Sequence, residues 1–160
     1  MRHLRRTFLA AVVAALSASS VAAVFAAPAS ATPPASFSAT YSESSVTTSV
    51  RSAGGNTFVT VADIATFSGD LTGAATATER FLFRRDGSFV LHSRGTCLCS
   101  VADRTGTFEF RVQGGGTLEN ASGTVVGVGS DGLKGLHWKA NWELVAPGVV
   151  ALSGTYHFDG

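Results

Sequence analysis

The fold is decided by the stretch Leu136-His137-Trp138-Lys139-Ala140-Asn141-Trp142-Glu143-Leu144. Apolar and polar residues alternate along it, and successive side chains of a β-strand point to opposite faces. The alternation therefore predicts a strand with one buried face and one face in water. Trp138 and Trp142 belong to the buried face, so we interpret them as interior residues rather than as an exposed cage for a ligand.

The same period of two recurs along the chain, and no sustained helical period follows residue 31. Phe108 and Phe110 share one face of a strand, and Tyr156 and Phe158 share a face of the last one. Turn signals such as Asp86-Gly87 separate the runs. The runs number nine or ten, and because every link between them is short, an antiparallel meandering barrel is favoured over a sandwich. The candidate strands are Phe37–Tyr41, Val46–Arg51, Thr57–Phe67, Ala74–Arg84, Ser88–Arg94, the segment around Cys97, Thr105–Val112, Gly123–Gly129, Leu136–Leu144 and Val149–Phe158.

Residues 1–31 have the three parts of a secretory signal peptide. Arg2, Arg5 and Arg6 precede an apolar stretch, and Ala29-Ser30-Ala31 offers a cleavage site before Thr32. Serines interrupt the apolar stretch, whereas a permanent membrane span needs roughly 20 continuous apolar residues. We therefore expect a signal helix that is removed and a secreted, extracellular product. The pair Arg5-Arg6 leaves both the general and the twin-arginine export routes open.

Cleavage after residue 31 would leave 129 residues: a flexible entry segment, 32–36, and one β-barrel domain, 37–160. All 11 acidic residues lie in this part, but three of the 12 Lys and Arg residues lie in the leader, so the net charge becomes about −2. No basic run exists there beyond Arg84-Arg85. Nucleic acid is therefore not expected as a partner. The sequence does not determine the oligomeric state.

Cys97 and Cys99 are the two cysteines of the chain. Residues i and i+2 of a strand point the same way with Cα atoms about 6.6 Å apart, near the upper edge of disulfide geometry. Outside the cytoplasm we expect a local disulfide if the backbone bends there, or two neighbouring thiols, but no bridge to a distant strand. His92 is the one further metal ligand nearby, so we expect no metal site and no cofactor.

Two carboxylates interrupt the predicted buried faces. Glu79 shares a face with Phe81 and Phe83, and Asp63 shares a face with Val61. An ionised carboxylate in an apolar interior is costly, so it either gains a partner or its pKa rises. The alternative is that each side chain lies near a strand end with its carboxylate in water.

A series of turn and strand-start motifs spans about residues 36–158: Phe67–Gly73, Gly87–Ser93, Gly106-Thr107-Phe108, Gly114–Gly116 and Gly132–Leu136. Their order resembles that of the bacterial allene oxide cyclase-like barrels. The resemblance implies an eight-stranded antiparallel barrel with a small cavity. Barrels of this kind include plant cyclases, dirigent-type proteins that guide coupling, and secreted bacterial proteins of unassigned function. No cyclase catalytic residue is carried over, because no motif here matches one position by position.

These observations predict a secreted barrel that binds a small apolar molecule without catalysis. One alternative is an isomerase or cyclase that acts on a small apolar substrate by positioning it and excluding water. Another is a structural or envelope-contact module filled by its own side chains. A hydrolase or metalloenzyme is not indicated, because the mature part has no Gly-x-Ser-x-Gly or His-x-x-x-His motif. The candidate cavity residues are Glu79, Asp63, Phe81, Phe83, Phe108, Phe110, Trp138, Trp142 and Tyr156, with Glu79 as the first choice for a polar group.

Overall fold

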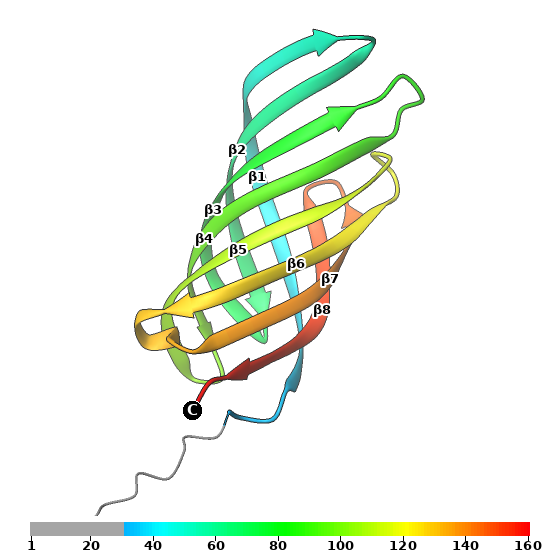
Figure 1. Ribbon diagram of the computed structural model, residues 1–160. Helices are drawn as coiled ribbons and strands as arrows, with labels where there is room; N and C mark the ends of the chain where they lie inside the picture. The colour runs from blue at the N-terminus through cyan, green and yellow to red at the C-terminus, as the bar shows by residue number, and fades with distance from the viewer. Residues whose placement is uncertain (1–30) are drawn as a thin grey trace, which may run out of the picture.

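Eight antiparallel strands form a closed barrel in the computed structural model, which describes residues 31–160 (Figure 1). Each strand pairs with the next one along the chain, and β8 returns to pair with β1. The predicted eight-stranded antiparallel barrel is therefore confirmed. The strands are β1 Ala35–Ala53, β2 Asn56–Gly69, β3 Leu71–Phe83, β4 Phe89–Val101, β5 Arg104–Gly116, β6 Ala121–Ser130, β7 Leu136–Ala146 and β8 Val149–Phe158.

The predicted signal peptide and its arginine pair lie outside the described residues, apart from residue 31. Of the predicted entry segment, residues 32–34 have no regular structure, and β1 begins at Ala35. Within residues 31–160, no helix has the length and apolar character that a membrane crossing requires.

Alternating burial explains why these sequences form strands. In β7 the buried positions are Leu136, Trp138, Ala140 and Trp142, and the polar residues between them are exposed. β5 buries Phe108 and Phe110 in the same way. A strand with this pattern can hide its apolar face when the sheet closes on itself, and closure also leaves no unpaired edge.

Two of the predicted strand boundaries are wrong, because the strands continue through them. Phe37–Tyr41 and Val46–Arg51 are parts of the single strand β1, where Ser42, Glu43 and Ser44 pair with β2. Ser88–Arg94 and the Cys97 segment are parts of β4, which stays paired through Gly95 with both β3 and β5. Ladder hydrogen bonds, with β2 for the polar residues of β1 and with both neighbours for Gly95 of β4, hold these positions in the extended conformation.

One end of the barrel, which we call the closed end, is sealed by the 3₁₀ turn η1, Asp131–Leu133. Leu133 is completely buried there. Its backbone passes so near to Gly106 and Gly129 that a Cβ atom at either glycine would collide with it. The two ends of the described part of the chain also meet at the closed end (Figure 1), where the Thr32 amide donates to the Phe158 carbonyl at 2.8 Å.

The opposite end, which we call the open end, is formed by the tight turns that join β1 to β2, β3 to β4, β5 to β6 and β7 to β8 (Figure 1). Strand β1 pairs with β8 only up to Ser42, yet it continues to Ala53 in partnership with β2. The β1–β2 hairpin therefore extends past the β7–β8 turn and forms a raised wall on one side of the open end.

Cys97 and Cys99 form a disulfide within β4, with Cα atoms 5.4 Å apart. Both residues are almost completely buried and belong to the apolar core near the closed end. The bridge joins positions two residues apart, as the alternation of side chains along a strand allows. It therefore acts as a local link and does not tie strands together.

Candidate functional site

A cavity of about 110 Å³ lies inside the barrel, in the half nearer the open end. Phe67, Phe110 and Trp138 line it on the side of the closed end, where their rings pack against the buried Phe108. The walls are mostly aliphatic and aromatic. An engineered apolar cavity of about 150 Å³ is large enough to bind benzene. The enclosed space is thus of the order that one small ring occupies, and a longer molecule would extend toward the open end.

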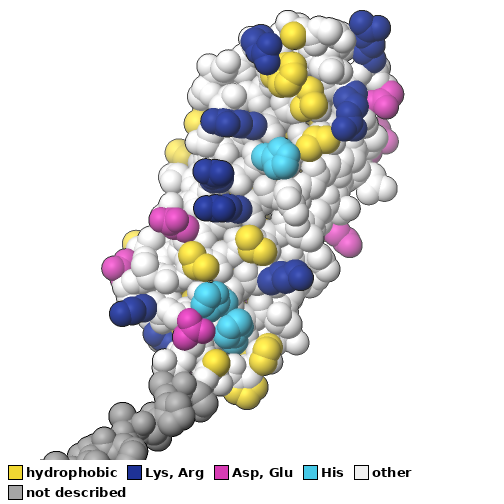
Figure 2. Space-filling model, in the orientation of Figure 1, with side chains coloured by type: hydrophobic (Ala, Val, Ile, Leu, Met, Phe, Trp, Pro, Cys, Tyr) yellow, Lys and Arg dark blue, Asp and Glu magenta, His cyan; other side chains and the backbone are white. Residues whose placement is uncertain are grey.

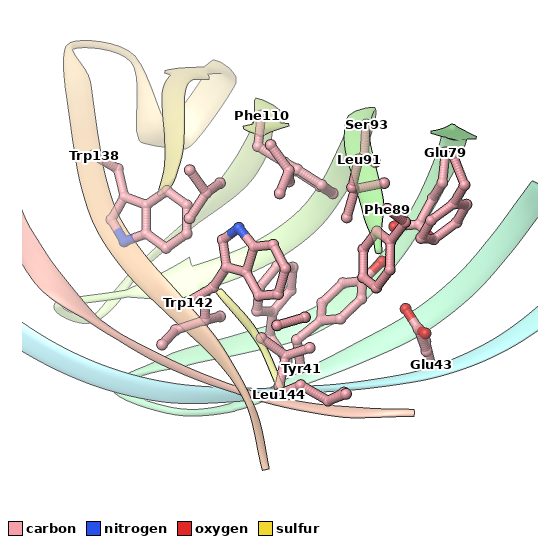
Figure 3. Close-up of a pocket in the computed structure, with 17 residues that line it drawn as sticks. Tyr41, Glu43, Glu79, Phe89, Leu91, Ser93, Phe110, Trp138, Trp142 and Leu144 are labelled. Atoms are coloured by element: carbon pink, nitrogen blue, oxygen red, sulfur yellow. The ribbon is translucent and has the colours of Figure 1, made fainter. Parts of the chain in front are cut away.

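Three carboxyl groups, which we call the carboxyl cluster, stand together on the β1–β2–β3 wall of this cavity. They belong to Glu43, Asp63 and Glu79, and their oxygen atoms lie within 4.8 Å of one another. Asp63 is only 2% exposed and Glu79 only 7%, while Glu43 is half-buried. Figure 3 shows Glu43 and Glu79 on the side of the pocket away from Trp138 and Trp142. The predicted alternative, in which Asp63 and Glu79 reach water at strand ends, does not describe this structure.

Asp63 is the member of the cluster with hydrogen-bond donors of its own. The Tyr41 hydroxyl donates to Asp63 Oδ2, and the Ser45 hydroxyl donates to Oδ1 at 3.3 Å. Burial raises the pKa of Asp63, whereas these hydroxyls and the backbone of Ile64 oppose the rise by stabilising the charged form. Burial and the bond to Asp63 also raise the pKa of Tyr41, so it remains a donor. Asp63 is therefore the member best suited to carry the negative charge.

Glu79 is in the opposite situation. Burial, followed by the negative charges of Glu43 and Asp63, raises its pKa to about 8. Burial and Asp63 also raise the pKa of Glu43. No Lys, Arg or His lines the cavity among the described residues, so no base offsets these effects. Glu79 consequently keeps its proton near neutral pH and presents an O–H donor.

Two more polar groups of the cavity lining lack partners. Ser93 pairs with Glu79 across β3 and β4 and lowers its pKa slightly, but no hydrogen bond of good geometry satisfies its hydroxyl. The buried Trp138 Nε1 has no acceptor among the described residues either. Trp142 differs, because its Nε1 donates to the Gln113 carbonyl at 3.2 Å. Buried polar groups without partners are costly, so this cavity has unused capacity to donate hydrogen bonds.

The structure distributes the predicted cavity residues over three places. Glu79, Phe81, Phe110, Trp138 and Trp142 line the cavity. Asp63 belongs to the carboxyl cluster behind Tyr41 and does not line the cavity itself. The remaining three lie above or below the cavity along the barrel axis. Phe83 packs on Phe81 and Phe89 at the open end. Phe108 and Tyr156 lie nearer the closed end.

Sequence reasoning missed Tyr41, Glu43 and Ser93. Tyr41 and Glu43 are two residues apart and point the same way from β1, so the period of two could have indicated them. Their strand was predicted to end at Tyr41, which hid the relation. Ser93 in β4 is the direct cross-strand partner of Glu79 in β3, and this neighbour can be identified only when the register of the two strands is known.

The carboxyl cluster offers three oxygen ligands of the kind that hard cations such as Ca²⁺ prefer. A cation there would have to displace the proton that Glu79 retains with its pKa of about 8, and burial raises the pKa values of Glu43 and Asp63 as well. The cluster is therefore better suited to hydrogen bonding than to holding a metal ion.

No protein-family model matches this chain, and no curated protein matches it either. Among solved structures it is similar to a protein of unknown function from the DUF3224 family of Shewanella oneidensis MR-1, at 16% sequence identity. The TM-score is 0.70, and the match covers 80% of this chain and 99% of that one. At this level of identity the likeness shows a common fold, the eight-stranded antiparallel barrel.

Proposed function

We propose that the barrel binds one small, uncharged, mainly apolar molecule that carries at least one oxygen acceptor, and that it does so without catalysis. The observation that carries this proposal is the apolar cavity with two buried donors that lack a partner, the Ser93 hydroxyl and the Trp138 indole, beside the protonated Glu79 carboxyl. Few, well-placed polar groups in an apolar pocket are typical of small-molecule sites. A carbonyl or hydroxyl oxygen of the ligand would accept the bonds that the protein leaves unmade.

The carboxyl cluster also defines what the cavity rejects. A ligand carboxylate or phosphate would lie beside the half-buried Glu43, whose carboxyl group is within 4.8 Å of that of Asp63, and no basic side chain lines the cavity to attract it. Like charges at short range in a low-dielectric interior repel strongly. The proposal therefore favours ketones, alcohols and ethers over fatty acids and other anions.

Binding can be followed with the protein's own fluorescence, because both tryptophans of the chain line the cavity. We expect cyclohexanone and cyclohexanol to change the emission in a saturable way and to bind more tightly than methylcyclohexane. Cyclohexanecarboxylate, of similar size, should have no effect. If none of the neutral compounds gave a saturable change in emission, the barrel would be better explained as a structural module than as a binding protein.

A pair of neighbouring substitutions provides the control. Val125 is 3% exposed and lines the cavity, whereas Val126 is 48% exposed on the outer face of the same strand. Val125→Phe should fill the cavity and reduce binding at least tenfold, and Val126→Phe should leave it unchanged. Equal effects of the two substitutions would place the bound molecule outside the barrel.

A second candidate function, an isomerase or cyclase, is favoured by the acid–base character of Glu79. A carboxyl group with a pKa of about 8 can donate or accept a proton near neutral pH, as general catalysis requires. This second candidate agrees with the resemblance of the sequence motifs to the allene oxide cyclase-like barrels, which include cyclases. It is distinguished from simple binding by Glu79→Gln, which would retain binding of cyclohexanone but abolish turnover of a substrate.

The proposal also includes export of the protein from the cell. We expect the N-terminal sequence of the secreted protein to begin at Thr32 or within a few residues of it, because Ala29-Ser30-Ala31 provides the small residues of a cleavage site. Sequencing of material from the culture medium checks this. Full-length protein beginning at Met1 in the medium would contradict it.

A further inference from the structure

Two histidines face each other on the outer surface of the barrel, on the far side of the wall from the cavity. His137 in β7 is the direct cross-strand partner of His157 in β8. Their rings are stacked with centroids 5.1 Å apart and planes inclined by 12°. The register of the sheet therefore fixes two imidazoles side by side, although 20 residues separate them in sequence.

One carboxylate lies beside the Nε2 atoms of both rings. Asp159 Oδ2 is 2.9 Å from His137 Nε2, and Asp159 Oδ1 is 3.9 Å from His157 Nε2. The Asp159 amide donates to the Gly135 carbonyl at 2.8 Å, which anchors the residue just beyond the end of β8. Both strands and the segment before β7 thus contribute to holding one carboxylate against two Nε2 atoms.

All three groups are accessible to solvent. The side chains of His137 and His157 are 47% and 37% exposed, and that of Asp159 is 58% exposed. Figure 2 shows histidine side chains gathered beside an acidic one on this face. An ion in solution can reach the cluster without any opening of the barrel.

We propose that His137, His157 and Asp159 form a surface site for a divalent transition-metal ion of the zinc type. Two imidazole nitrogens and one carboxylate oxygen are ligands that such ions prefer, and a set of three leaves a coordination position for water or another molecule. The proposal does not depend on what the cavity binds.

The geometry needs little adjustment to accept the ion. The three ligand atoms lie within 4.8 Å of one another, and bonds of about 2.0–2.2 Å to a tetrahedral ion would bring them to roughly 3.3 Å apart. Exposed side chains can make this movement by small rotations about their χ angles. Each neutral imidazole would keep its proton on Nδ1, so that the Nε2 lone pair binds the metal.

The test is calorimetric titration of the untagged protein with Zn²⁺ in a buffer that does not chelate metals. We expect one ion per chain, with affinity falling at least tenfold in His157→Ala and in Asp159→Asn. The matched control is His92→Ala, which removes an exposed histidine of β4 outside the cluster and should leave binding unchanged. Thermal unfolding of each variant without metal verifies that it is folded.

Co²⁺ supplies a second readout that a nonspecific effect would not reproduce. A tetrahedral site with nitrogen and oxygen ligands should give visible ligand-field absorption, and the absorption should vanish in His157→Ala. Zinc binding that survives in His157→Ala but is lost in Glu43→Gln would assign the ion to the carboxyl cluster and overturn the proposal. Equal losses in His92→Ala and His157→Ala, or no binding by the unmodified chain, would overturn it too.

Discussion

Replacing Glu79 by glutamine is expected to stabilise the barrel at pH 8 and to flatten the dependence of its stability on pH. The pKa of Glu79 is about 8 in the folded protein, against a usual value of 4.5. Between these two values the folded chain holds a proton that the unfolded chain has released. Stability must then fall as pH rises through this window, and it levels off above pH 8.

The expected size follows from the shift. The whole fall amounts to at most about 5 kcal/mol, because each pKa unit corresponds to about 1.4 kcal/mol. Glutamine keeps the shape and the hydrogen-bonding capacity without the charge, so the variant should gain about 2–5 kcal/mol over the unmodified protein at pH 8 and little at pH 4. Such a gain raises the melting temperature by roughly 10 °C.

Thermal unfolding between pH 4 and pH 9 measures this effect, and Glu109→Gln is the matched control. Glu109 is exposed on the outer face of β5, where a substitution usually changes stability by no more than about 0.5 kcal/mol. If the stability of the Glu79 variant falls with pH as steeply as that of the unmodified protein, Glu79 is not a buried, protonated group.

Phe108→Ala is expected to destabilise the barrel by about 3–5 kcal/mol, a large part of the net stability of a typical domain. Phe108 is 1% exposed, and its ring centroid lies 5.4 Å from that of Trp138 and 5.6 Å from that of Phe110. Truncation would remove this packing and open a cavity between the closed end and the candidate site. Urea unfolding followed by circular dichroism measures the loss.

The comparison is Phe81→Ala at the open end. Phe81 is half-buried and lines the cavity, so its truncation should cost only about 1–2 kcal/mol while altering the fluorescence response to cyclohexanone. Together the two substitutions separate residues that hold the barrel together from residues that shape its cavity. Equal destabilisation by both would contradict this division.

The strands that the sequence revealed best are those whose interior side is uniformly apolar. β7 could be predicted from its start to Leu144, two residues before its end at Ala146, because every second residue from Leu136 to Leu144 is apolar. A meandering barrel followed from several such strands with short links between them, whereas the number of eight strands came from the resemblance to a known barrel family. Closure itself depends on the pairing of β1 with β8, which joins residues more than 100 positions apart and has no local signal.

The strands that were divided wrongly are those that build the candidate site. Tyr41, Glu43 and Ser45 continue the inward face of β1, but a run of polar residues looks like a link. In β4, Ser93 and Gly95 occupy inward positions, the first opposite Glu79 and the second beneath the ring of Phe110. Local rules fail where a polar function replaces an apolar core, so the two errors mark the site.

The His137, His157 and Asp159 cluster could not be predicted from spacing, because 20 residues separate the two histidines and the register of β7 against β8 brings them together. Both histidines lie on the outer side of their strands. Metal-binding motifs describe ligands that are close together in the chain. A motif search therefore misses ligands that strand pairing brings together.

The position of the two chain ends has a practical meaning for how the barrel can be used. Residues 31 and 160 leave it near each other at the closed end (Figure 1). A bead, a carrier domain or a surface joined at residue 31 or at residue 160 would hold the barrel by its closed end, with the open end pointing away from the support. Immobilised copies would keep the open end turned toward the surrounding solution, so the proposed binding of small molecules could be measured on a support.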